Sequence, residues 1–130
     1  MSQEISIFVD YPETMDQLAS QVERVVPVRF KEFTPDQARF FEARNDYFIV
    51  TIGKNILEND RDLNFEDYTY EIEIRAIRNR SYESNEQRTW AEIPLIFSKL
   101  QPVLNCRMML VDNIQKKLAD YQPALVSTEQ

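Results

Sequence analysis

The strictest pattern in this chain of 130 residues is an alternation of apolar and polar side chains between Tyr68 and Ile77. Successive side chains of a β-strand point to opposite faces of a sheet, so the alternation predicts a strand with one buried and one solvated face. The apolar set is Tyr68, Tyr70, Ile72, Ile74 and Ala76, and the polar set is Thr69, Glu71, Glu73 and Arg75. A fold built around this strand must cover one side of a sheet and leave the other side wet.

Four further segments are rich in β-branched and aromatic residues and predict strands. They are residues 5–11 (ISIFVDY), 26–31 (VPVRFK), 47–52 (YFIVTI) and 106–111 (CRMMLV). The segment 47–52 is continuously apolar, which is typical of a strand that is covered on both faces. We expect it to pair with residues 69–77 as an antiparallel hairpin whose long connection is residues 54–66.

Helix start signals stand between these strands. Capping-box spacing, in which two side chains satisfy N–H groups of the first helical turn, occurs at Thr14–Gln17, Ser84–Gln87 and Asp112–Gln115. The dipeptide Thr34-Pro35 is a fourth start, because proline suits the first helical position. We therefore expect helices at residues 14–26, 35–43, 84–100 and 112–121. Pro94 kinks the third helix or divides it into two.

The order of these elements predicts an α+β fold. We expect a mixed or largely antiparallel sheet of about five strands with three or four packed helices. No repeat, low-complexity tract or linker divides the sequence, so residues 1–123 are expected to form a single globular domain. Residues 124–130 are expected to be a disordered tail.

Two residue types on which many active sites depend are almost missing. The chain has no histidine, which removes the commonest general base and the usual metal ligand. Gly53 is its only glycine, whereas phosphate-binding loops need several glycines so that backbone N–H groups can approach the anion. We therefore expect a protein that is not an enzyme and that uses neither a cofactor nor a metal.

The sequence also indicates a compartment. No run approaches the roughly 20 apolar residues that span a bilayer, and the first residues lack the basic start of a signal peptide. The single cysteine, Cys106, has no partner for an internal disulfide and lies in an apolar stretch, which predicts a buried thiol. We expect a cytoplasmic protein that does not associate with membranes.

The net charge of −7 is concentrated in one segment. Residues 58–73 contain seven acids, and Arg61 is the only base among them. Such a segment repels the phosphates of nucleic acids, because affinity for DNA depends on Lys and Arg. It attracts a basic protein surface instead. We expect a basic protein partner and no binding of nucleic acid.

Part of this acidic segment resembles a calcium-binding loop. In residues 60–71 (DRDLNFEDYTYE), oxygen-bearing side chains occupy the first, third, fifth and twelfth positions. Phe65 stands where the loop needs glycine for its sharp turn. The alternation that begins at Tyr68 also indicates a strand, which would carry Glu71 away from the loop carboxylates. The segment therefore predicts an acidic connection rather than a metal site.

Glu71 and Glu73 could instead form an acid/base pair of the glycosidase kind. Along a strand they would lie about 6.5 to 7 Å apart, which such a pair allows. An open, highly charged strand face offers little desolvation to raise either pKa, however. We therefore expect no catalysis at these residues.

These observations favour a small acidic protein-interaction module. The specific hypothesis is an immunity or inhibitor protein that neutralises a basic toxin or nuclease by covering its surface. The predicted contact residues are Asp60, Asp62, Phe65, Glu66, Asp67, Tyr68, Glu71 and Glu73. Phe65 and Tyr68 are the apolar anchors of this set. The alternatives are a small-molecule-binding or carboxylate-dependent metabolic domain, and a structural homo-oligomer, in the simplest case a homodimer, in which the hairpin edge pairs with its symmetry mate.

Overall fold

A computed structural model describes residues 4–123, which form an α+β fold with one seven-stranded antiparallel sheet. The strands are β1 (Glu4–Val9), β2 (Lys31–Phe33), β3 (Phe40–Arg44), β4 (Phe48–Lys54), β5 (Tyr70–Ala76), β6 (Met108–Asp112) and β7 (Lys116–Tyr121). The helices are α1 (Met15–Val25) and α2 (Tyr82–Leu104), and two short 3-10 helices are η1 (Pro35–Gln37) and η2 (Phe65–Asp67). The strands lie in the order β2-β3-β4-β5-β1-β6-β7.

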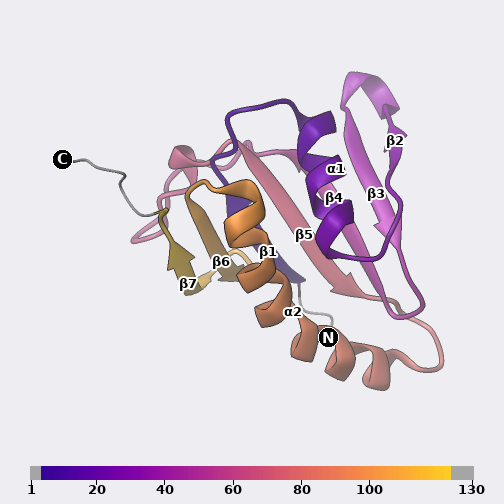
Figure 1. Cartoon of the computed structure of the whole chain (residues 1–130). Coiled ribbons are helices and arrows are strands. Elements are labelled where there is room, and N and C mark those ends of the chain that lie inside the picture. The colour runs from indigo at the N-terminus through magenta and orange to yellow at the C-terminus, as the bar shows by residue number, and fades with distance from the viewer. Residues whose placement is uncertain (1–3, 124–130) are drawn as a thin grey trace.

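Both α-helices cover the same face of the sheet (Figure 1). Alternate residues of the central strands point into this layer, among them Ile7 of β1 and Ile72 of β5, which face each other across the β1–β5 ladder. Leu18 of α1 and Leu100 of α2 close the layer from the helix side, and both are fully buried. We call this apolar layer the helix-side core.

The opposite face of the sheet is covered only in part. Phe8 of β1 and Met109 and Val111 of β6 point to this face and are buried under the connection between β4 and β5. We call this smaller cluster the loop-side core. Over β3, β4 and β5 no described element covers this face, and we call that region the open face. Its side chains, by strand register, are Phe40, Glu42, Arg44, Ile49, Thr51, Glu71, Glu73 and Arg75.

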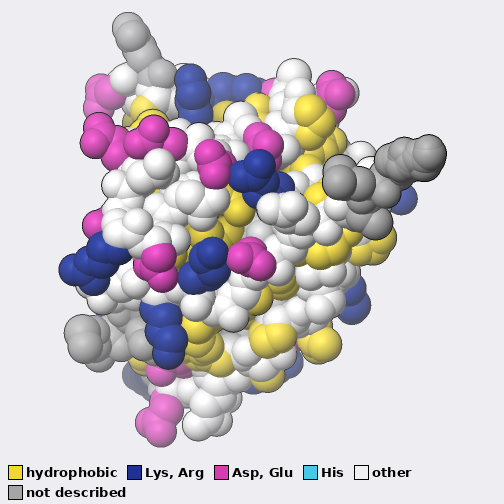
Figure 2. Space-filling view, turned by 90° about the vertical axis from the view of Figure 1, so that its left-hand side faces the viewer, with side chains coloured by type: hydrophobic (Ala, Val, Ile, Leu, Met, Phe, Trp, Pro, Cys, Tyr) yellow, Lys and Arg dark blue, Asp and Glu magenta, His cyan; other side chains and the backbone are white. Residues whose placement is uncertain are grey.

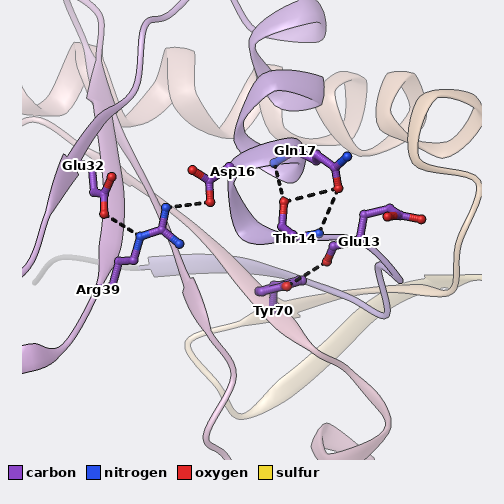
Figure 3. A network of polar contacts seen from close by, with 7 residues as sticks. All are labelled: Glu13, Thr14, Asp16, Gln17, Glu32, Arg39 and Tyr70. Carbon is purple, nitrogen blue, oxygen red and sulfur yellow. Dashed lines mark hydrogen bonds and ion pairs between the residues drawn. The ribbon is translucent and has the colours of Figure 1, made fainter.

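Polar side chains fix α1 to the edge of the sheet (Figure 3). The capping box predicted at Thr14 is confirmed, because the Thr14 side chain accepts from the Gln17 N–H and the Gln17 side chain accepts from the Thr14 N–H. Arg39 then joins α1 to β2, since its guanidinium group pairs with Asp16 at 2.6 Å and also with Glu32. This bridge links α1 to the short edge strand β2, which is also paired with β3.

The prediction of about five strands and three or four helices is wrong in detail, because two predicted helices are strands. Residues 35–43 form only the single turn η1 and then β3, in which Phe41 and Ala43 are buried while their neighbours are not. Local capping signals favoured a helix, but pairing with β4 buries this alternating pattern as a strand.

The predicted helix at residues 112–121 is the second such strand. Asn113 and Ile114 adopt φ values of 53° and 58°, and the Gln115 N–H donates to the Asp112 carbonyl, so these residues form a tight hairpin turn between β6 and β7. Turns of this kind usually carry Asn-Gly, and a β-branched residue is disfavoured at positive φ. Ile114 in the place of glycine therefore hid the hairpin in the sequence.

Three smaller predictions also need correction. The strand predicted at residues 26–31 is displaced, because only its last residue, Lys31, lies in a strand, where β2 begins. The helix α2 is not divided into two, since it continues through Pro94 to Leu104. The segment 47–52 is not covered on both faces, because Ile49 and Thr51 lie half-buried on the open face. The predicted antiparallel pairing of β4 with β5 is confirmed. The predicted tail, residues 124–130, lies outside the described residues.

Candidate functional site

The acidic segment forms a long connection between β4 and β5, which we call the acidic loop (residues 55–69). Its two ends lie side by side, because the Asn55 N–H donates to the Thr69 carbonyl at 2.9 Å. Connections of this length without long regular elements are uncommon in compact proteins and are often functional. The loop lies at the left of Figure 1, on the side of the sheet that carries β7.

The inner side of the acidic loop is apolar. Leu63, Phe65 and Tyr68 are almost fully buried and form the loop-side core with Phe8 of β1. The ring centroids of Phe8 and Phe65 lie 4.9 Å apart, and those of Phe8 and Tyr68 lie 6.5 Å apart. Contacts of this kind bury aromatic surface on both partners. The loop is thus fixed to the sheet along its inner side.

Asparagine side chains fix the backbone of the acidic loop. The Asn55 amide donates to the carbonyls of Phe65 and Tyr68 at 2.7 and 2.9 Å. Asn59 and Glu66 exchange two hydrogen bonds, in which each side chain accepts from the backbone N–H of the other residue. These bonds satisfy backbone groups of an irregular segment, although the Phe65 carbonyl also accepts from the Tyr68 N–H in η2. The two asparagines therefore brace a loop in which no regular element is longer than η2.

A tight turn stands at the tip of the acidic loop. The N–H and carbonyl of Asp60 bond to the carbonyl and N–H of Leu63 at 3.0 and 2.8 Å. Arg61 lies between them with a φ of 57°. The turn points the side chain of Leu63 inward and leaves Asp60 and Asp62 exposed.

The outer side of the acidic loop carries its carboxylates. Glu58, Asp60 and Asp62 are exposed, and among the described residues none of the three is hydrogen-bonded or ion-paired through its side chain. Asp67 pairs with Arg107 at 3.0 Å. Figure 2, which views this side of the molecule, shows acidic and basic side chains interspersed on the surface rather than gathered into one acidic patch. Glu58, Asp60 and Asp62 are therefore the acids of the loop whose charge no ion pair with a described residue offsets.

The structure separates the predicted contact residues into three groups. Four acids of the set lie exposed on the acidic loop, namely Asp60, Asp62, Glu66 and Asp67. Phe65 and Tyr68 are 1% and 6% exposed, so the prediction that they are anchors on the surface is wrong. Their rings already pack on Phe8 inside the protein. Glu71 and Glu73 lie on the open face, outside the loop.

Glu71 and Glu73 are more buried than the alternation predicted. The Ser6 hydroxyl donates to Glu71 at 2.6 Å, and burial raises the pKa of Glu71 above its usual range. Burial and the neighbouring Glu4 carboxyl raise the pKa of Glu73 to about 7, and the ion pair with Arg75 at 2.8 Å opposes that rise. The expectation of little desolvation on this face was therefore wrong. The cause is the packing of these short carboxylates between neighbouring strands.

The calcium-loop pattern is not assembled as a chelating site in the described residues. Phe65, in the position of the required glycine, begins η2 with its side chain buried. Asn64 donates to Asp67 at 2.7 Å, while β5 carries Glu71 to Ser6. Within residues 4–123, no group of three or more His, Cys, Asp or Glu side chains could hold a metal ion.

Sequence reasoning missed the residues that hold the acidic loop in place. Asn55 and Asn59 each precede an apolar or acidic residue in a segment without periodicity, so nothing in the sequence marks them as braces. Leu63 could have been found, because it is the one aliphatic residue between Asp60 and Phe65. The predicted burial of Cys106 is confirmed, and burial raises the pKa of its thiol to about 11.

Comparisons of the chain with protein-family models, with curated proteins and with solved structures found no match. Within residues 4–123, neither α1 nor α2 has the length and apolar character that crossing a membrane requires.

Proposed function

We propose that this protein is an interaction module that binds a basic protein through the outer side of the acidic loop. Its specific role would be that of an immunity-type inhibitor, which neutralises a toxin or nuclease by covering its cationic surface. The contact residues of the proposal are Glu58, Asp60, Asp62, Glu66 and Asp67. The observation that carries the proposal is that Glu58, Asp60 and Asp62 are exposed, have no partner among the described residues, and lie on a loop whose inner side is buried.

A fixed loop supports this role because binding then costs little conformational entropy. A flexible segment of the same charge would have to become ordered when its partner binds, which weakens the complex. Here the loop-side core and the Asn55 and Asn59 hydrogen bonds hold the backbone that carries the carboxylates before any partner arrives. The proposal therefore predicts affinity that depends on the loop being braced as well as charged.

The local charge supports the role through association kinetics. Residues 58–67 carry five carboxylates and one arginine. Opposite charges on two surfaces speed their encounter, and the effect falls as salt screens it. An inhibitor that must capture a toxin quickly gains from such steering.

The test is affinity capture from the native host extract at low and at moderate salt. The immobilised proteins are the wild type, a loop variant with Glu58→Gln, Asp60→Asn and Asp62→Asn, and a control variant with Glu13→Gln, Asp46→Asn and Glu83→Gln. Both variants lose three exposed negative charges. We expect the wild type and the control to retain one basic protein, and the loop variant to retain about fivefold less or lower.

The retained partner is then purified, and binding rates and the partner's own activity are measured. We expect the loop variant to associate more slowly, with a smaller change in its dissociation rate, and to inhibit the partner less. A partner that the loop variant captures as well as the wild type does would overturn the proposed contact surface. A captured partner whose activity is unaffected would limit the role to that of an adaptor.

One alternative function has a specific observation behind it. The pKa of Glu73 near 7 suits a general acid or base, which would favour a carboxylate-dependent activity on the open face. The two cavities that we describe below are lined by neither Glu71 nor Glu73. The homo-oligomer alternative required a free edge on the β4–β5 hairpin. Both outer sides of this hairpin are already paired, with β3 on one side and β1 on the other.

A further inference from the structure

A cavity of about 690 Å³ opens at the β2 edge of the sheet, away from the acidic loop. Its lining residues are Pro27, Val28, Arg29, Lys31, Phe33, Glu42, Ala43 and Arg44. They come from the connection between α1 and β2, from β2 itself and from the end of β3, which lie at the right of Figure 1. The volume falls in the range of small-molecule sites in proteins.

The cavity lies where β3 extends beyond its edge neighbour β2. β2 pairs only with residues 40–42 of β3, so Ala43 and Arg44 have a strand neighbour on one side only, namely β4. The connection before β2 makes other bonds instead. The Val28 N–H donates to Val26, the Phe30 N–H donates to the Glu23 carboxylate, and proline at position 27 has no N–H to offer.

The cavity is cationic in a protein that is acidic as a whole. Arg29, Lys31 and Arg44 line it, against the single carboxylate of Glu42. Among the described residues, none of these three cations forms an ion pair, whereas Arg39, Arg75 and Arg107 do. Unpaired cations that surround one space attract an anion more strongly than the same charges spread over a surface.

A second, smaller cavity extends the cationic region. It has a volume of about 380 Å³, and Arg44 lines both cavities. The smaller one also has Arg75 and Arg78 in its lining, together with Ile49 and Ile77. Arg44 therefore stands between two hollows that have cationic and apolar walls.

The main cavity also has an apolar wall. Phe33 is 42% exposed although it is aromatic, and it stacks on Phe40 with ring centroids 5.4 Å apart and an angle of 17° between the rings. Pro27 and Val28 add aliphatic surface to the lining. An exposed, rigid aromatic ring beside guanidinium groups suits a ligand that has both an apolar body and a negative charge.

We propose that this cavity binds a small organic oxyanion, that is, a carboxylate or phosphate group attached to an aromatic or aliphatic body. Arg29, Lys31 and Arg44 hold the anionic group, and Phe33 packs on the apolar body. The site is separate from the acidic loop, because none of its lining residues belongs to residues 55–69 and the buried side chains of that loop pack on β1 and β6. The protein thus has one acidic surface for a macromolecule and one cationic pocket for a small molecule.

The test uses probes that differ in charge and share an apolar body. The probes are 4-phenylbutyrate, phenethyl phosphate and 4-phenylbutylamine, each titrated into ¹⁵N-labelled wild-type protein and followed by amide chemical shifts. We expect saturable shifts at residues 27–33 and 42–44 with one or both anions, and binding of the amine that is at least about tenfold weaker. Preference between the two anions identifies the oxyanion class.

Variants sharpen the same measurement. Arg29→Gln and Arg44→Gln should each weaken anion binding by about fivefold or more, and Glu42→Gln should strengthen it, because it removes the only carboxylate of the lining. Lys99→Gln, which removes an exposed cation of α2 with the same charge change, should have no effect. Phe33→Ala should weaken the binding of all three probes.

Several results would overturn the proposal. They are the absence of saturable shifts with either anion, shifts that map outside the cavity, and equal binding of the amine and the anions. Unchanged affinity in both arginine variants would do the same, provided that their amide spectra show an intact fold.

Discussion

The two faces of the sheet are covered by different means, and the comparison between them explains much of the sequence. Two α-helices cover the helix side, where the strands present isoleucine, valine and phenylalanine. On the opposite side, an irregular loop covers β1 and β6, while the face of β3, β4 and β5 stays open. Strands that are covered on both sides, such as β1, are apolar at almost every position, whereas β5 alternates Ile with Glu. A strand is therefore apolar at alternate positions when one of its faces is covered, and at almost every position when both faces are covered.

The comparison also shows where function can be placed. The helix side contributes little exposed polar surface from the sheet, because its side chains are used in packing. The opposite side offers a braced acidic loop, half-buried carboxylates and, at its edge, the cationic cavity. Loops on a rigid scaffold are common places for binding residues. Substitutions in the helix-side core and in the loop-side core measure whether the acidic loop contributes to folding as the two helices do.

The largest effect is expected from removing the aromatic ring at the centre of the loop-side core. Phe65→Ala should lower the free energy of unfolding by about 3 to 5 kcal/mol, since the ring is buried against Phe8. Leu100→Ala, on the helix side, should lower it by about 2 to 5 kcal/mol. Urea unfolding measures both values.

Hydrogen exchange then distinguishes the effects of the two variants on the two sides of the sheet. Phe65→Ala should increase exchange first in residues 55–69, whereas Leu100→Ala should act through α2 and the central strands. A change of less than about 1 kcal/mol for Phe65→Ala would show that the loop cover is not part of the cooperative fold.

The second prediction concerns the Asn55 amide, which braces the acidic loop. Asn55→Ala removes the donor of the Tyr68 carbonyl, leaves the Phe65 carbonyl with only the Tyr68 N–H, and should lower the free energy of unfolding by about 1 to 3 kcal/mol. Asn55→Asp keeps the oxygen that accepts from the Leu57 N–H, removes the donor, and adds a charge that the two carbonyls repel. A loss in Asn55→Asp at least as large as in Asn55→Ala would assign the effect to the two carbonyls. Full stability of Asn55→Asp would instead assign it to the Leu57 bond.

The third prediction is a pH dependence that comes from Glu73 on the open face. Its pKa of about 7 in the folded protein lies above the ordinary value of 4.5, so the folded state holds the proton more tightly than the unfolded chain. The stability from this group is therefore full below about pH 4.5 and is lost as the pH rises through 7. We expect a loss of about 1 to 2 kcal/mol between pH 5 and pH 8, after allowance for partial exposure.

Urea unfolding of the wild type and of Glu73→Gln at the two pH values isolates this contribution. The variant should gain stability relative to the wild type at pH 8 and should match it more closely at pH 5. Glu58→Gln, on the exposed side of the acidic loop, is the control and should show no such difference. A wild type and a Glu73→Gln variant that respond equally to pH would contradict the raised pKa.

The smallest effect is expected at the edge of the sheet. Arg39→Ala removes the ion pairs with Asp16 and Glu32, but all three side chains are partly exposed. The loss of stability in urea unfolding should be smaller than in any variant above, and it should shrink in high salt. Arg39→Lys should recover only part of that loss, because lysine cannot reproduce the two-sided contact of the guanidinium group. A loss as large as that of Asn55→Ala would mean that the β2 edge depends on this bridge far more than exposed pairs usually allow.

The sequence by itself determined the α+β class, the cap of α1 and the pairing of β4 with β5. These features depend on local chemistry or on side-chain periodicity, which a sequence displays directly. It also located the acidic loop, because a long polar segment between two paired strands must leave the sheet. The exposure of Asp60 and Asp62 followed from the cost of burying unpaired charge.

Only the tertiary structure decided which residues of the acidic loop point inward. Phe65 and Tyr68 looked like exposed anchors because their neighbours are acids, yet both are buried on Phe8. The reason is that β1 presents Phe8 to a face that the helices do not cover, and only the loop can cover it. The strands β3 and β7 were likewise decided by their neighbours, β4 and β6, against local helix signals. Such contacts join residues far apart in the chain, so no local pattern records them.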